Sequence, residues 1–301
     1  MIVERLPHNP VIYPDMDERM GSNINGPSLI RVPEWLERPL GRYYLYFAHH
    51  QGQYIRLAYA DRLEGPYRTY VPGTLRLEQT PCRGHIASPD VHVDDENRRL
   101  IMYYHGPVDP EKVTVGEELG AAFCVDGQRS FVAVSCDGIH FESGSEVLAT
   151  SYMRAWRFDG HVYALGMPGI VFRSEDGLTG FERGPTLFSE DMRHTAVRLD
   201  GDRLEVYYSN AHDCPEHILV STVELGEDWM SWTASEPASL LAPGMDYEGA
   251  NLPLVPSRRG WAPEPVRQLR DPAIYYEEGR TYLLYSVAGE RGIAIAEILG
   301  E

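Results

Sequence analysis

The chain has 301 residues, of which 43% are hydrophobic and 24% charged, so it can bury the core of one large domain or two small ones. Its net charge of −18 argues against nucleic acid or an anionic membrane as a partner. No apolar run approaches the ~18 residues that a membrane helix needs. The N-terminus MIVERLPHNP also lacks the apolar segment of a signal peptide, so we expect a cytoplasmic protein. The spacing of the four cysteines predicts reduced, mostly buried residues and neither a disulfide framework nor a zinc site: Cys82, Cys124, Cys136 and Cys214.

A strand pattern recurs five times along the chain. Each copy contains two alternating apolar strands joined by a turn with Gly, Asp or Asn, which is typical of a β-hairpin. The copies occupy residues 26–50, 88–106, 154–169, 194–211 and 271–289. A third strand follows each copy, and four copies continue into a short fourth segment, at 72–79, 145–151, 184–191 and 238–246.

Four strands repeated five times predict an all-β protein, a single-domain five-bladed β-propeller. The fifth copy ends at GIAIAEILGE without a fourth strand, whereas the segment NPVIYPDMD (9–17) near the N-terminus has no hairpin of its own. We therefore predict that an N-terminal strand completes the last blade and closes the ring, which removes the open sheet edges. The blades are expected at about 24–80, 85–151, 152–191, 192–246, and 268–298 together with 9–16.

The most specific motif is Arg270-Asp271-Pro272 at the start of an inner strand. Inner strands of all blades begin around one axis, so their first residues converge on a single cleft. Proline suits the first position of a strand because it cannot donate a ladder hydrogen bond. The carboxylate before it is expected to point into the cleft, where Arg270 would lower its pKa and keep it ionised.

With this motif and blade organisation, the chain resembles the five-bladed propeller glycoside hydrolases of families 32, 43, 62 and 68 and the related mannoside phosphorylases. The resemblance covers nearly the whole chain and implies that Asp271 is the carboxylate that stabilises the transition state. It also implies a carboxylate in the first blade, where this sequence has 23–27 (NINGP), and a general-acid glutamate in the third, where it has 152–156 (YMRAW). Both are absent from those segments, which leaves the standard two-carboxylate mechanism open.

Other residues are candidates to supply the missing chemistry. Glu248, in a loop that leads into the fifth blade, is a candidate relocated general acid, and Asp90 a possible base. His194 has the position in the fourth blade that Asp271 has in the fifth, and it is expected to face Asp271 across or beside the axis. Further expected substrate contacts are Asn25, Glu290 and Trp156, whose ring could stack on a sugar face. Three arginines could bind an acidic group of the substrate: Arg154, Arg193 and Arg270.

Four more histidines lie at strand ends that the repeat places on the same face: His49, His50, His85 and His105. Three interpretations stay open for them: contact with substrate or proton transfer, a bound metal ion at an axial histidine cluster, or a structural role. No cofactor is otherwise predicted. The long acidic loop 107–130 is compatible with a lid or with an oligomer contact.

These observations favour a carbohydrate-active enzyme, a glycoside hydrolase that acts on a possibly acidic oligosaccharide in the axial cleft. Two alternatives stay open. One is a non-catalytic glycan-binding propeller, which the missing carboxylates suggest. The other is a histidine-dependent metalloenzyme or polysaccharide lyase on the same fold.

Overall fold

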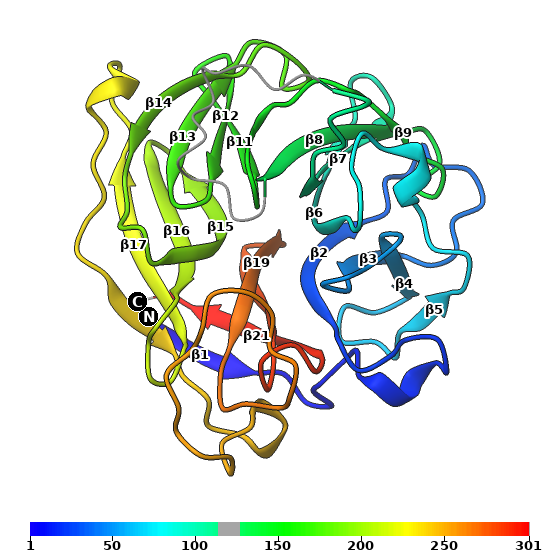
Figure 1. Ribbon diagram of the computed structural model, residues 1–301, viewed down its shortest axis with the longest axis vertical. Coiled ribbons are helices and arrows are strands. Elements are labelled where there is room, and N and C mark those ends of the chain that lie inside the picture. Colours follow the sequence, from blue (N-terminus) through cyan, green and yellow to red (C-terminus); the bar gives the residue numbers. More distant parts are fainter. Residues whose placement is uncertain (114–126, 301) are drawn as a thin grey trace.

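A computed structural model describes residues 1–113 and 127–300, and the strands of these residues form five antiparallel sheets around a common axis (Figure 1). The predicted five-bladed β-propeller is therefore confirmed. Part of the loop 107–130, residues 114–126, lies outside the described residues.

In each blade the strands follow one another outward from the axis. Blade 1 contains β2 (Asn25–Arg31), β3 (Tyr43–Ala48), β4 (Arg56–Ala60) and β5 (Arg68–Tyr70). Blade 2 contains β6 (Ala87–Asp94), β7 (Arg99–Pro107), β8 (Gln128–Ser135), β9 (Glu142–Ser143) and β10 (Ala149–Thr150). Blade 3 contains β11 (Arg154–Phe158), β12 (His161–Gly166), β13 (Ile170–Ser174) and β14 (Glu182–Thr186).

The remaining two blades follow the same order. Blade 4 contains β15 (Met192–Asp200), β16 (Arg203–Asn210), β17 (Ile218–Glu224) and β18 (Ala238–Leu241). Blade 5 contains β19 (Arg270–Glu277), β20 (Arg280–Ser286), β21 (Ile293–Leu299) and the N-terminal β1 (Ile2–Arg5). Short 3₁₀-helices lie in the connections: η1 (Pro14–Met16), η2 (Leu77–Gln79), η6 (Trp229–Ser231) and η7 (Asp246–Glu248).

An N-terminal strand closes the ring as predicted, but it is not the predicted segment 9–16. The strand β1 pairs antiparallel with β21, from Ile2 opposite Leu299 to Arg5 opposite Ala296. The segment 9–16 instead makes one isolated bridge to blade 5, from Ile12 to Ile293, and then turns into η1. The sequence pattern misled because Val11 and Ile12 are buried, whereas β1 is an outer strand whose side chains are exposed or half-buried.

The fourth strands also differ from the predicted segments. In blade 1 the predicted segment 72–79 contains no strand; the outer strand is β5, at 68–70, and 77–79 form η2. In blades 2 to 4 the outer strands overlap the predicted segments but are shorter than them. Outer strands have weak apolar patterns because one face and one edge meet solvent, so sequence locates them poorly.

The inner strands share an irregularity where they begin near the axis. In β2, β6, β15 and β19 the pairing register shifts within the first residues, as in a β-bulge. At each shift, and just before β11, one residue has a left-handed backbone with φ between 49° and 58°: Gly26, Ser88, Tyr152, His194 and Asp271. Such a backbone costs a non-glycine residue about 1–2 kcal/mol, and strain of this kind often marks a functional site.

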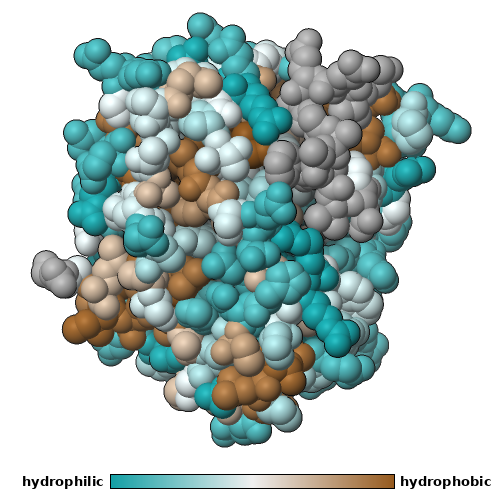
Figure 2. Space-filling view, turned by 60° about the vertical axis from the view of Figure 1, so that its left-hand side comes forward, coloured by the Kyte–Doolittle hydropathy of each residue, from teal (hydrophilic) through white to brown (hydrophobic). Residues whose placement is uncertain are grey.

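Between the blades, apolar and tyrosine side chains form the core. Five tyrosines of the second strands are fully buried in this core: Tyr44, Tyr46, Tyr104, Tyr207 and Tyr285. The view in Figure 2 shows a largely hydrophilic surface on which hydrophobic residues form small, separate patches.

The described residues also test what the sequence predicted about membrane helices and cysteines. None of their helices has the length and apolar character needed to cross a membrane. Their cysteines are unpaired, with Cys82 buried but Cys136 and Cys214 exposed, so the prediction of mostly buried thiols was wrong for these two. Cys124 lies outside the described residues.

Candidate active site

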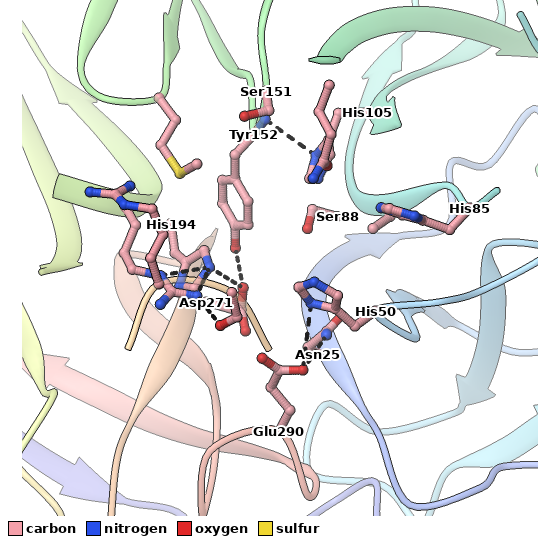
Figure 3. A pocket seen from close by; sticks show the side chains of 16 residues that line it. Asn25, His50, His85, Ser88, His105, Ser151, Tyr152, His194, Asp271 and Glu290 are labelled. Carbon is pink, nitrogen blue, oxygen red and sulfur yellow. Dashed lines mark hydrogen bonds and ion pairs between the residues drawn. The ribbon is translucent and has the colours of Figure 1, made fainter. Parts of the chain in front are cut away.

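A cavity of about 90 Å³ lies on the propeller axis, where the inner strands begin (Figure 3). The left-handed residues Ser88, Tyr152, His194 and Asp271 all line it, so this backbone conformation turns the four side chains toward the axis. The fifth such position is Gly26, where an added Cβ would lie 2.9 Å from the Cα of Ser88. Blade 1 therefore has no side chain at this position.

The predicted residues that the structure brings together at this cavity come from blades 1, 2, 4 and 5: Asn25, His50, His85, His105, Arg193, His194, Asp271 and Glu290. Figure 3 shows them around one open centre, with His194, Tyr152 and Asp271 close together and His50, Asn25 and Glu290 beside them. The convergence expected from the repeat is thus present.

Asp271 is a buried carboxyl group that has a neighbour from each of two other blades. Its side chain lies 3.1 Å from the hydroxyl of Tyr152, which donates to Oδ1, and Oδ1 is 3.6 Å from Nε2 of His194. Burial raises the pKa of Asp271 to about 6, and the negative charge of Glu290 acts in the same direction, against Arg193 and Arg270. Arg270 lowers the pKa of Asp271 as expected, but burial and Glu290 outweigh it, so the expected net decrease was wrong.

The contacts of Arg270 explain this result. Its Nε lies 3.0 Å from Oε2 of Glu216, and its Nη1 donates to Oε1 of Glu290 at 3.1 Å. Its Nη2 donates to Oε1 of Gln268 at 2.6 Å. The guanidinium is buried below the cavity and neutralises two glutamates, so its sequence neighbour Asp271 has no cation of its own.

Glu290 is the second carboxyl group at the axis, and its surroundings favour the ionised form. Its Oε2 accepts hydrogen bonds from the side-chain amides of Asn23 and Asn25 at 2.5 and 3.1 Å, and its Oε1 accepts from the backbone N–H of Ala262 at 3.2 Å. Burial acts to raise the pKa of Glu290, but His50, Arg270 and the Asn23 amide together lower it. The axis thus holds two carboxyl groups whose pKa values are pushed in opposite directions.

Three of the cavity histidines, His50, His105 and His194, are neutral near pH 7 because they are buried. Burial lowers the pKa of His50 to about 4 and places those of His105 and His194 well below the usual value for histidine. In His194, Nε2 accepts from Arg193 at 3.0 and 3.1 Å, and a guanidinium can only donate, so the ring proton lies on Nδ1. His194 therefore cannot donate its proton to Asp271 from Nε2.

The metal-ion alternative has no support in this arrangement. Among residues 1–113 and 127–300, no three His, Cys, Asp or Glu side chains are placed to hold one ion. His50 and His85 are instead near-parallel, with ring centroids 6.0 Å apart and an interplanar angle of 27°. His49 does not line the cavity; its Nδ1 accepts from the backbone N–H of Gln51 at 2.9 Å.

Glu248, the predicted general acid, lies away from the cavity and has a structural contact instead. Its buried carboxylate pairs with Arg5 of β1, with Oε1 2.7 Å from Nε and Oε2 2.9 Å from Nη2. Its Oε1 also accepts from the hydroxyl of Tyr285 at 2.8 Å. Glu248 thus fastens the closing strand to blade 5, and the prediction of a catalytic role was wrong.

Asp90 and Trp156 also lie outside the cavity lining. Asp90 follows the left-handed Ser88 by two residues, and its carboxylate pairs with His92 at 2.8 Å and accepts from the backbone N–H of Ala155 in blade 3 at 3.0 Å. Trp156 is buried beside Tyr163, with ring centroids 5.9 Å apart. Neither residue can serve as the base or the sugar platform predicted for it.

The arginines have mainly internal partners. Arg154 does not line the cavity; it donates to the backbone oxygens of Ser88 and Met153 and lies over the ring of Tyr152, 4.3 Å from its centroid. Arg193 does line it, but its Nη1 and Nη2 donate to the backbone oxygens of Arg258 and Gly260. The expected grip of three arginines on an acidic substrate group is therefore not formed.

Sequence reasoning missed three residues of this region. Tyr152 could have been found by aligning the starts of the inner strands, since it occupies the position of His194 and Asp271. Trp261, in the loop before blade 5, is 43% exposed and lies near-parallel to His50 at 6.3 Å between ring centroids. Glu216 precedes β17 and carried no recognisable motif.

No family model matches the chain. Among solved structures, the chain resembles CoXyl43, a GH43 β-xylosidase/α-arabinofuranosidase from a compost microbial metagenome. The two chains are 12% identical, the TM-score is 0.63, and the alignment covers 100% of this chain and 96% of CoXyl43. A putative glycoside hydrolase from Parabacteroides distasonis has a TM-score of 0.65 at 13% identity, covering 98% and 95%. At these identities the likeness shows the fold, which agrees with the resemblance found in the sequence.

A curated relative shows the family. It is the uncharacterized protein R118 of Acanthamoeba polyphaga mimivirus, 34% identical over 335 residues that span 99% of this chain and 90% of the relative. The chain therefore belongs to the family of mimivirus protein R118, and it has the five-bladed propeller fold of the GH43 glycoside hydrolases.

Proposed function

We propose that this protein is a glycoside hydrolase that cleaves a glycosidic bond in the axial cavity. The observation that carries the proposal is the pair Asp271 and Glu290, two buried carboxyl groups whose surroundings push their pKa values apart. A carboxyl group with a raised pKa can donate a proton, and a nearby ionised one can stabilise positive charge, which are the two tasks of glycoside hydrolysis.

Asp271 is assigned as the general acid. With a pKa of about 6 it is protonated in mildly acidic solution and can transfer its proton to the leaving-group oxygen as the glycosidic bond breaks. The hydroxyl of Tyr152 then donates to the carboxylate that remains. This assignment differs from the stabilising role that the sequence resemblance implied for Asp271.

Glu290 is assigned as the fixed anion. Its hydrogen bonds from Asn23, Asn25 and Ala262 hold the ionised carboxylate in place, where it can stabilise an oxocarbenium-like transition state. The neutral imidazole of His50 has its Nδ1 3.7 Å from Oε2 of Glu290 and can accept the proton of an attacking water. The water oxygen bonds to the anomeric carbon, so one water is consumed for each glycosidic bond that breaks.

The substrate class follows from the cavity and the comparisons. One related fold, the GH43_1 enzyme of Xanthomonas citri, 13% identical with a TM-score of 0.60, was solved in complex with xylotriose, which supports an oligosaccharide substrate. Because the predicted arginines have internal partners, we infer a neutral sugar residue in the cavity in place of an acidic one. A panel of neutral and uronic oligosaccharides tests this inference, since preferential cleavage of uronic substrates would contradict it.

The catalytic assignment is tested with Asp271→Asn on aryl glycosides and neutral oligosaccharides. Loss of a general acid is expected to lower kcat/KM by about 10²- to 10⁴-fold. Asp200→Asn is the matched control, because the Asp200 side chain is 70% exposed and lies at the end of β15 in blade 4. Unchanged turnover of Asp271→Asn would remove Asp271 from the mechanism.

A further inference from the structure

Glu216 is a fully buried carboxylate that the proposed mechanism does not use. It precedes β17 in blade 4, behind the residues that line the cavity. Its Oε1 accepts from the hydroxyl of Ser209 at 2.7 Å, and its backbone oxygen accepts from the N–H of Leu269, the residue before Arg270, at 3.0 Å. The side chain and the start of β19 are thus fixed relative to each other.

The carboxylate of Glu216 faces the two guanidiniums whose charges act on Asp271, Arg193 and Arg270. Its Oε2 lies 3.0 Å from Nε of Arg270, and its Oε1 lies 3.7 Å from Nε of Arg193. The same Oε1 is 3.9 Å from Nδ1 of His194, the nitrogen that carries the ring proton. One carboxylate therefore contacts two guanidiniums and faces the imidazole beside the proposed acid.

Glu216 decides whether the cations near Asp271 are matched by other carboxyl groups. Two buried guanidiniums, Arg193 and Arg270, lie within ion-pair distance of two buried glutamates, Glu216 and Glu290. The third carboxyl group, Asp271, is then in excess. A buried carboxylate without a cation of its own favours its protonated form.

We propose that Glu216 is a positioning residue, which binds Arg270 and lies against Arg193 so that neither cation pairs with Asp271. It would keep the acid protonated without touching the substrate. The catalytic consequence rests on the proposed function, but the charge arrangement does not.

The experiment measures the titration of Asp271 by ¹³C NMR, with its carboxyl signal assigned by its loss in Asp271→Asn. The charged and titratable groups that face Asp271 are Tyr152, Arg193, His194, Arg270 and Glu290, and Asp213 lies near Glu216. In Glu216→Gln a negative charge is lost and both cations are less neutralised. The midpoint is expected to fall by on the order of one pH unit.

Two further variants complete the test. Glu205→Gln is the matched control, because Glu205 is a buried glutamate of the same blade that accepts from Tyr207 and Arg198, so the midpoint should not move. The double variant Glu216→Gln, Arg270→Gln removes one charge of each sign and should return the midpoint toward the wild-type value. It also serves if the single variant fails to fold, because it removes the buried charge of Arg270 together with that of Glu216.

The outcomes separate this inference from the proposed function. An unchanged midpoint in folded Glu216→Gln, or a midpoint in the double variant one unit below wild type, overturns the role of Glu216. If the midpoint falls but the wild type hydrolyses no glycoside, the role of Glu216 stands and the proposed function fails. If hydrolysis depends on Asp271, the falling limb of kcat/KM against pH should move to lower pH with the NMR midpoint.

Discussion

Replacing Asp271 with Asn should stabilise the protein at alkaline pH. The carboxyl group is 3% exposed, and its pKa rises from a usual value of 3.8 to about 6 in the folded state. A raised folded pKa means that the stability associated with this group is fully present below about pH 4 and is lost as the pH rises through 6. A pKa shift of about two units corresponds to about 3 kcal/mol of folding stability, which the wild type loses at alkaline pH. Asp271→Asn does not lose this stability, because Asn carries no charge to bury.

The assay is thermal unfolding of both proteins at pH 4 and pH 8. For a chain of 301 residues, the unfolding entropy of about 2.1 cal/mol/K per residue gives about 0.6 kcal/mol/K, so 3 kcal/mol corresponds to about 5 °C. Asp271→Asn should therefore raise Tm by about 5 °C more at pH 8 than at pH 4. An equal change at both pH values would refute the assignment of a buried, cation-free carboxyl group, and Asp200→Asn should show no such pH dependence.

Three other substitutions test the site and the ring closure. Tyr152→Phe removes the hydrogen bond that stabilises ionised Asp271, so the falling limb of kcat/KM against pH should move to higher pH. The shift is opposite to the one expected for Glu216→Gln. A shift to lower pH would contradict Tyr152 as the donor to Asp271. The exposed ring of Trp261 can contact the part of an oligosaccharide that extends beyond the cavity. Trp261→Ala should then raise KM several-fold for long substrates with little change in kcat. Steady-state kinetics with long and short substrates measure this effect. Glu248→Ala removes the carboxylate that accepts from Arg5 and from the Tyr285 hydroxyl. The free energy of unfolding, measured in urea, should therefore fall by about 3 kcal/mol. A decrease of less than about 0.5 kcal/mol, as is usual at exposed sites, would contradict the role of Glu248 in ring closure.

The sequence predicted the ring because the repeat is carried by inner and second strands, whose apolar patterns are strong. It predicted Asp271 and His194 as axial residues for the same reason, since both occupy equivalent positions of the repeat. It failed for Glu248, because a loop position does not reveal toward which blade a side chain turns. Glu248 meets Arg5, and those residues are 243 positions apart in the chain.

The electrostatics of the site were the hardest part to predict. Adjacency in sequence suggested that Arg270 and Asp271 form a pair, yet the bulge at the start of β19 turns the two side chains to different neighbours. Arg270 meets Glu216 and Glu290, which come from two other connections. The partner of a buried charge is decided by the tertiary arrangement, which no local motif encodes.

The left-handed residues at the axis have a consequence for how this family can diversify. The backbone, rather than the residue type, aims each side chain, so an exchange at Ser88, Tyr152, His194 or Asp271 alters the chemistry at the centre while the blades keep their hydrogen bonding. Gly26 is the exception, because its neighbour Ser88 occupies the space of any Cβ. The first blade could thus carry a side chain at this position only if Ser88 of blade 2 lay farther away.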